Sequence, residues 1–108
     1  QAYLLQATIT VQFPESVRTV GEAVRHLLQQ SGYRLAGPDA AGPESAYLFA
    51  LALPAVQRSL GPMPLKRALE TLAGPAFRLV EDPVHRLIAF ERCVMEWQAA
   101  NHLVSPQR

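Results

Sequence analysis

The chain has 108 residues, of which 49% are hydrophobic, and its ten basic and nine acidic side chains give a formal net charge of +1. This apolar fraction argues against disorder, and the length favours a single domain over residues 1–108, with a core over about 4–91 and a tail over 92–108. No Lys or Arg run is dense enough to follow a phosphate backbone, and the longest apolar stretch, Ala46–Val56, is shorter than the roughly twenty residues of a membrane span. We therefore expect no nucleic-acid partner and no membrane span in this stretch of sequence.

The first third of the chain predicts a strand, a helix and a second strand. Leu4–Phe13 alternates apolar and polar residues from Ala7 onward, which is typical of a half-buried strand. Thr19 and Glu22 have the spacing of a capping box, and Ser31-Gly32 ends the predicted helix. The apolar stripe of this helix consists of Val20, Ala23, Val24, Leu27 and Leu28. Tyr33-Arg34-Leu35 then predicts the start of a short strand.

The middle of the chain is less regular. Ala36–Ser45 is rich in Pro and Gly, which predicts a loop between two halves. Ala46–Leu53 is too short an apolar run for periodicity to separate a helix from a buried strand, although Glu44 or Ser45 as an N-cap favours the helix. Val56–Leu60 weakly predicts a third strand that ends at Gly61-Pro62.

A helix followed by a β-hairpin is predicted next. Leu65, Ala68, Leu69 and Leu72 have helical spacing, with Pro64 in the first turn and Gly74-Pro75 as the stop. The two strands of the hairpin are Phe77–Glu81 and Arg86–Glu91, joined through Asp82-Pro83. Arg92–His102 either extends the last strand or forms a tail helix, and the remaining residues are expected to fray.

The two helix-to-strand segments resemble one another. Thr19–Leu35 aligns with Pro64–Leu79, so that both halves read as strand, amphipathic helix, glycine stop and aromatic-led strand. A chance likeness between two such transitions would predict the same architecture. The sequence therefore predicts an α+β fold in which two strand–helix–strand halves form a small mixed sheet packed on two helices.

The titratable side chains form no recognisable catalytic or metal-binding set. His26, His85 and His102 lack metal-ligand spacing, and each is expected to be solvent-exposed. Cys93 with His85 would need an orienting third group that the sequence does not supply, and a lone thiol such as Cys93 is usually a small packed hydrophobe. Phosphate-binding glycine loops and nucleophile-elbow motifs are also missing from the sequence. We expect a non-enzymatic binding or assembly module without catalytic residues, metal or other cofactor.

Several segments resemble the PilL protein of integrating conjugative elements. The likeness covers most of Thr19–Glu91, and its most specific part is the Arg-Ser-Leu-Gly-Pro-Met segment at Arg58–Met63. The Pro-Leu-Lys-Arg-Ala-Leu pattern beginning at Pro64 is more distantly similar to the short N-terminal domain of secretins and TonB-dependent signalling receptors, and to the pilus-assembly protein TcpQ. The resemblance implies a periplasmic or outer-membrane-associated component of a conjugative type IV pilus, with a cleaved leader and room for a lipid tether upstream. The implied partner is a pilus secretin or another pilus assembly protein.

Two hypotheses for function follow. In the first, the domain is a pilus-assembly module that docks by pairing an edge strand with a protein partner, with Leu48 and Phe49 as exposed apolar anchors. In the second, it is a sensory domain that binds a small ligand or peptidoglycan in a concave pocket. The candidate polar groups for that pocket are Arg34, Arg58, Arg78 and Arg86. Arg58 and Arg86 are also candidate partner-binding residues.

Overall fold

The computed structural model describes residues 4–36 and 43–93. Its helices and strands are, in chain order, β1 (Thr8–Gln12), α1 (Val20–Leu28), β2 (Arg34–Leu35), α3 (Pro43–Ala50), β3 (Ser59–Pro64), α4 (Leu65–Ala73), β4 (Phe77–Asp82) and β5 (Leu87–Arg92). Short 3-10 turns span Leu4–Gln6 and Ala55–Gln57. The α+β class is confirmed, and β1–α1–β2 and β3–α4–β4 are the two predicted strand–helix–strand halves.

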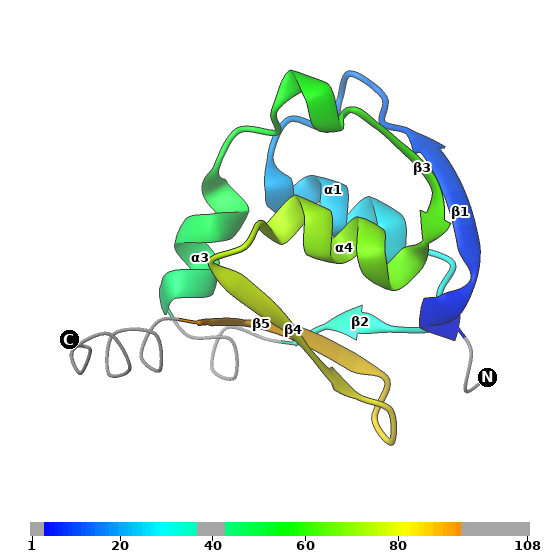
Figure 1. Cartoon of the computed structure of the whole chain (residues 1–108). Helices are drawn as coiled ribbons and strands as arrows, with labels where there is room; N and C mark the ends of the chain where they lie inside the picture. The colour runs from blue at the N-terminus through cyan, green and yellow to red at the C-terminus, as the bar shows by residue number, and fades with distance from the viewer. Residues whose placement is uncertain (1–3, 37–42, 94–108) are drawn as a thin grey trace, which may run out of the picture.

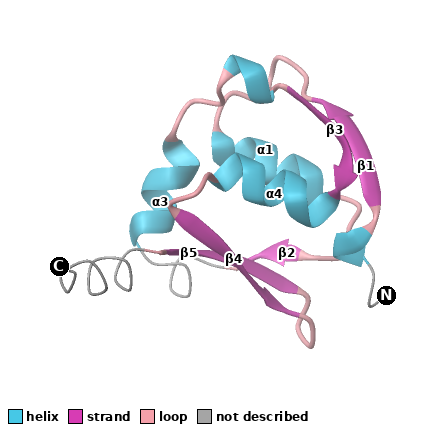
Figure 2. Cartoon of the chain, in the orientation of Figure 1, coloured by secondary structure: helices cyan, strands magenta, loops and turns pink. Residues whose placement is uncertain are grey.

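The strands form two small sheets rather than one. β1 and β3 pair antiparallel, while β2, β5 and β4 form a three-stranded mixed sheet in that order. Figure 1 and Figure 2 show α1 and α4 lying side by side between the two sheets. The predicted single sheet is therefore split, because each half contributes its first strand to one sheet and its last strand to the other.

Helices α1 and α4 supply the centre of the core through the predicted stripes. Ala23 and Val24 on α1, and Ala68 and Leu69 on α4, are fully buried. The capping box of α1 is confirmed: the Thr19 hydroxyl accepts from the Glu22 N–H at 3.1 Å, and the Glu22 carboxylate accepts from the Thr19 N–H at 3.2 Å. The two helices pack against each other, so that the halves share one core.

Helix α3 resolves the ambiguity in the middle of the chain in favour of a helix. It begins at Pro43, so the predicted loop over Ala36–Ser45 ends earlier than expected. Ser45 is buried and its hydroxyl donates to the carbonyl of Phe90 at 2.9 Å, which ties α3 to β5. The described residues thus contain a third helix, α3, in addition to α1 and α4.

Two of the predicted strands have different bounds. The first begins only at Thr8, because Leu4–Gln6 forms a 3-10 turn in which Leu5 is buried. The third is β3, which starts at Ser59 and continues through Gly61-Pro62 to Pro64. The hairpin of β4 and β5 matches the prediction to within a residue at each end. The question of a tail helix concerns residues that lie largely outside the described ones.

A β-bulge in β3 interrupts the register of the β1–β3 sheet. Ile9 pairs with Met63 and Val11 with Leu60, so that Gly61 and Pro62 together lie opposite the single residue Thr10. The Gly61–Pro62 peptide is cis, and Gly61 has φ of 105°. A Cβ at Gly61 would lie within 2.3 Å of the Ile9 carbonyl oxygen. Only glycine can occupy this position without displacing β1.

Candidate functional site

The predicted apolar anchors are largely inside the molecule. Leu48 is only 3% exposed and belongs to the core, and Phe49 is half-buried with its ring edge-to-face against Phe90 at 5.9 Å between centroids. The expectation that both residues are exposed is therefore wrong, because α3 directs this part of its surface inward. The exposed apolar side chains of this region are Tyr47 and Leu51 instead.

The four candidate arginines do not converge on one pocket. Arg58 donates to the Pro14 carbonyl at 2.7 Å, and Arg86 lies over the Tyr33 ring at 5.7 Å from its centroid. Arg34 is exposed on β2, and Arg78 forms an ion pair with Glu91 at 3.0 Å on the hairpin. Arg58 and Arg86 thus have structural contacts that account for their positions.

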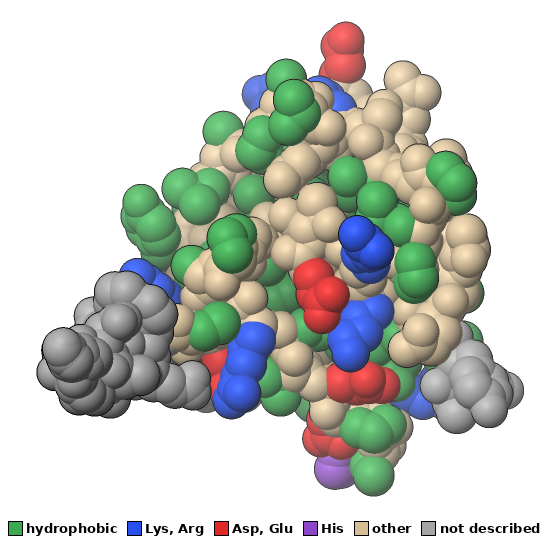
Figure 3. All heavy atoms as spheres, in the orientation of Figure 1, with side chains coloured by type: hydrophobic (Ala, Val, Ile, Leu, Met, Phe, Trp, Pro, Cys, Tyr) green, Lys and Arg blue, Asp and Glu red, His purple; other side chains and the backbone are tan. Residues whose placement is uncertain are grey.

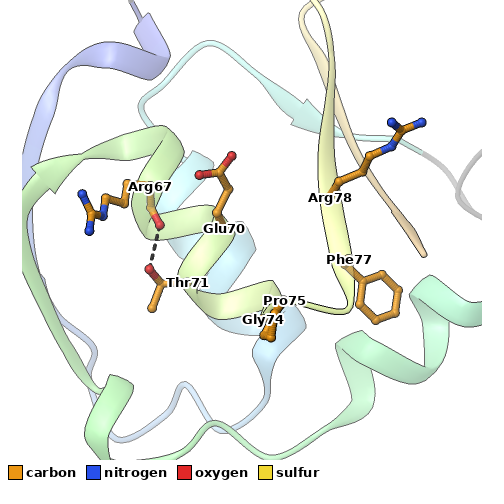
Figure 4. A pocket seen from close by; sticks show the side chains of 7 residues that line it. All are labelled: Arg67, Glu70, Thr71, Gly74, Pro75, Phe77 and Arg78. Carbon is orange, nitrogen blue, oxygen red and sulfur yellow. Dashed lines mark hydrogen bonds between the residues drawn. The ribbon is translucent and has the colours of Figure 1, made fainter. Parts of the chain in front are cut away.

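Arg78 lines a hollow that has a volume of about 410 Å³ and lies between α4 and the start of β4. Arg67, Glu70 and Thr71 of α4 supply its other polar side chains. Figure 4 shows Arg67 and Arg78 pointing in opposite directions, away from each other. The hollow therefore lacks the convergent cationic groups that an anionic ligand requires.

The titratable residues are dispersed. His26 is half-buried, with its ring 5.4 Å from that of Phe13, so the expectation of an exposed histidine is wrong there. His85 is exposed, as expected, whereas Cys93 is an exposed free thiol and not a packed one. His85 and Cys93 flank opposite ends of β5, roughly 20 Å apart at about 3.3 Å per residue, which excludes a nucleophile–base pair. His102 lies outside the described residues, and among the described ones no group of three or more His, Cys, Asp or Glu could hold a metal ion.

Hydrogen bonds within the fold shift the pKa values of three described side chains, Glu22, Tyr33 and Asp82. Backbone hydrogen bonds from Arg18 and Thr19 lower the pKa of Glu22 at the start of α1. The hydrogen bond from the His85 ring at 2.9 Å lowers the pKa of Asp82 in the hairpin turn. The Tyr33 hydroxyl donates to Glu81 at 2.7 Å, and this bond raises the pKa of Tyr33. The three carboxylates act as caps and acceptors, which is a structural role.

The backbone of β1 presents an unpaired edge. The N–H of Leu65 donates to Ala7 and that of Phe13 donates to the Arg58 carbonyl, so the bonded positions of β1 are the odd-numbered ones. Thr8, Thr10 and Gln12 consequently direct their N–H and C=O groups away from β3. Among the described residues no strand pairs with this side of β1.

A groove of about 440 Å³ runs alongside this edge, between β1 and the C-terminal part of α1. Its β1 side is formed by Ile9, Thr10 and Val11, and its helix side by His26, Leu27, Gln29 and Gln30. None of these residues carries a permanent charge. An open strand edge beside a largely uncharged groove has the geometry that accepts an extended peptide as an additional strand.

The opposite edge of the same sheet is poorly suited to pairing. β3 contains Pro62 and Pro64, which have no N–H to donate. Proline on an edge strand is one of the features that prevent strand addition. Among the described residues, the β1–β3 sheet therefore has one edge that is suited to strand addition and one that is poor in donors.

Sequence reasoning named edge pairing as the docking mode but did not identify the groove residues. Leu27, Gln29 and Gln30 were interpreted only as part of the predicted helix, and His26 was considered only as a titratable side chain that would be exposed. The available signal is their position, because His26 and Leu27 lie in the last turn of α1 and Gln29 and Gln30 follow directly after it. Which strand lies beside that flank depends on tertiary contacts and cannot be obtained from spacing.

Comparisons with known proteins returned nothing similar to this chain. No protein-family model matches it, and neither a curated protein nor a solved structure does. Among residues 4–36 and 43–93, no helix has the length and apolar character needed to cross a membrane.

Proposed function

We propose that this domain is a non-enzymatic assembly module of a conjugative type IV pilus, which docks on the pilus secretin by accepting one of its extended segments at the open edge of β1. The observation that carries the proposal is the unpaired edge at Thr8, Thr10 and Gln12 beside the groove formed with α1. Backbone bonds would provide the affinity, and the groove would select the side chains of the incoming strand.

The sequence resemblance supports the pathway. Its most specific segment, Arg58–Met63, includes most of β3 and the bulge at Gly61-Pro62. This segment holds β1 in place and leaves the opposite edge of the sheet poor in donors. The proposed location is the periplasm, in association with the outer membrane, because a secretin is reached from that side.

The groove chemistry indicates what kind of strand would fit. Ile9, Val11 and Leu27 are half-buried apolar residues, whereas Gln29 and Gln30 are exposed amides. An incoming strand with apolar residues directed into the groove, and no requirement for a particular charge, matches this surface. Binding of this kind depends little on salt, because no ion pair is formed.

Thr10→Pro tests the proposal. Proline at this position removes an N–H that points away from β3, so the β1–β3 ladder is retained while the edge loses a donor. We expect affinity for the purified periplasmic region of the secretin from the same conjugative element to fall at least about tenfold, a loss of roughly 1.4 kcal/mol. The measurement is biolayer interferometry with Thr10→Ala, which keeps the N–H, as the matched control.

Two outcomes would overturn the proposal. One is a wild-type domain that does not bind the secretin, and the other is a Thr10→Pro variant that binds as tightly as wild type. Circular dichroism and a urea midpoint within error of Thr10→Ala establish that the proline variant is folded. Binding of a muropeptide by the wild-type domain, with no binding to the secretin, would instead favour a sensory function.

A further inference from the structure

The free edge of β4 provides a second surface for strand pairing, in the other sheet. The N–H groups of Arg34 and Ala36 donate to the carbonyls of Arg86 and Ile88, so Ile88 directs its backbone towards β2. Leu87, Ala89 and Glu91 must then face β4. Their partners in the ladder are Asp82, Val80 and Arg78. The bond from the Cys93 N–H to the Ala76 carbonyl extends the same alternation.

The intervening residues of β4 therefore point their backbone groups outward. Leu79 and Glu81 present both N–H and C=O at the free edge, whereas the Phe77 N–H is directed to the Gly74 carbonyl at 3.3 Å. Among the described residues no strand pairs with this edge. Figure 3 shows basic and acidic side chains next to each other over the face that carries α4 and β4. Like the edge of β1, this one flanks a hollow formed with the helix of its own half.

We infer that this edge pairs antiparallel with β4 of a second copy of the chain, about a two-fold axis at Val80. In that register Val80 lies opposite Val80, and Arg78 lies opposite Asp82 of the second copy, once on each side of the axis. Outward-pointing residues must face each other, so Leu79 bonds to Glu81 of the second copy. The pairing would join the two three-stranded sheets into one sheet of six strands.

Charge distinguishes this register from its neighbours. Shifting the pairing by one allowed step in one direction places Arg78 opposite Val80, and a further step places Arg78 opposite Arg78. A shift in the other direction places Glu81 opposite Glu81. Directly opposed like charges destabilise a strand pair, while opposed Arg and Asp stabilise it. The register centred on Val80 combines complementary charges with an apolar pair at the axis.

The ion pair of Arg78 with Glu91 and the hydrogen bonds of Asp82 with His85 are compatible with this pairing. Arg78 bridges to Glu91, but a guanidinium has five N–H donors and can serve both carboxylates. Asp82 accepts from the ring and backbone N–H of His85, and a carboxylate has acceptor sites to spare. Both side chains are held on the outer face of the hairpin by these contacts, and so they are oriented before pairing.

Val80→Lys tests the surface, because it places two ammonium groups opposite each other at the axis. We expect sedimentation equilibrium of the wild-type chain, whose single copy is 11.9 kDa, to show a monomer–dimer equilibrium in the micromolar range. The Val80→Lys dissociation constant should be at least about tenfold higher. Val56→Lys is the matched control, since Val56 is 86% exposed in the turn before β3 and should leave the dimer unchanged.

The register itself is tested by cross-linking in a Cys93→Ser background. Val80→Cys should form a disulfide dimer on mild oxidation, because non-bonded antiparallel pairs have Cα atoms about 4.5 Å apart. Arg78→Cys alone should not, since its two copies would be separated by four residues, or about 13 Å. A mixture of Arg78→Cys and Asp82→Cys should form the mixed dimer. A monomer at all concentrations, a dimer insensitive to Val80→Lys, or equal cross-linking at positions 78 and 80 would overturn the inference.

Discussion

The two halves of the chain use the same helical stripe to build two different open edges. In the first half, β1 lies beside α1 and the groove residues carry no permanent charge. In the second half, β4 lies beside α4, and the adjoining hollow contains Arg67, Glu70 and Arg78. The stripe fixes where each helix packs, whereas the residues flanking it determine what the edge can bind. An uncharged groove suits a foreign strand, and a charged edge suits a partner with matched charges.

The largest effect should come from breaking the shared core. Leu69→Ala removes a side chain that is fully buried on α4, and we expect the free energy of unfolding to fall by about 2–5 kcal/mol. Val24→Ala at the equivalent position of α1 should cost roughly 2 kcal/mol, from two methyl-sized groups and a smaller cavity. Urea denaturation measures both. A larger loss of unfolding free energy for Val24→Ala than for Leu69→Ala would contradict this prediction.

Within the second half, two glycines with positive φ differ in the space around them. Gly61→Ala combines φ of 105° with a Cβ that would collide with the Ile9 carbonyl, so we expect a loss of about 3 kcal/mol and a displaced β1. Gly74→Ala also has positive φ, at 81°, but its Cβ would meet no atom within 4 Å, so the expected loss is about 1 kcal/mol. Thermal unfolding of the two variants measures both losses, and the loss should be larger for Gly61→Ala, where the added Cβ has no room.

A smaller effect is expected at the helix starts. Thr19→Ala should destabilise the domain by about 1 kcal/mol, because the Glu22 N–H loses its acceptor. Helix α4 begins after Pro64 with no side-chain cap. Pro64→Ser should therefore supply α4 with the kind of cap that α1 already has, and the variant should be no less stable than wild type. The urea midpoint of each variant, compared with that of wild type, measures the loss at Thr19 and the effect of the new cap at position 64.

The smallest effect concerns pH. His85 lowers the pKa of Asp82, so the ionised carboxylate stabilises the hairpin turn above its unfolded pKa of about 3.9. That contribution is lost as the pH falls through the lowered folded pKa. Asp82→Asn should thus be less stable than wild type at neutral pH, and the difference should shrink in strong acid. Urea midpoints near pH 7 and pH 3 would show a constant difference if this linkage were absent.

The sequence permits prediction of the elements that depend on local patterns. The capping box at Thr19, the stripe at Leu65–Leu72 and the Asp82-Pro83 turn all act over a few residues, and each was predicted correctly. Leu48 and Phe49 were misplaced because the register of α3 depends on its packing against α1 and β5. The Ser45, Leu48, Phe49 spacing is compatible with a buried stripe, but a short apolar run offers no polar face for contrast.

The candidate surfaces were harder to predict than the fold. Edge pairing was expected, but whether β1 has a free edge depends on which strand lies next to it, and that contact joins residues about fifty positions apart. The division into two sheets is equally non-local. The groove beside Thr10 and the outward backbone groups at Leu79 follow only once the ladders are known. Arg58 and Arg86 were plausible binding residues by type and proved to be engaged within the fold.

The prolines of β3 set a limit on how far any assembly can grow. Strand addition at β1 cannot continue on the far side of the sheet, because Pro62 and Pro64 offer no donors to a further chain. A two-fold contact at β4 is likewise closed, since each copy uses the same surface that it presents to the other. Together, the two proposed contacts would give a complex of two copies and two partners. On the β3 side, the prolines oppose the stacking of strands that leads to fibres.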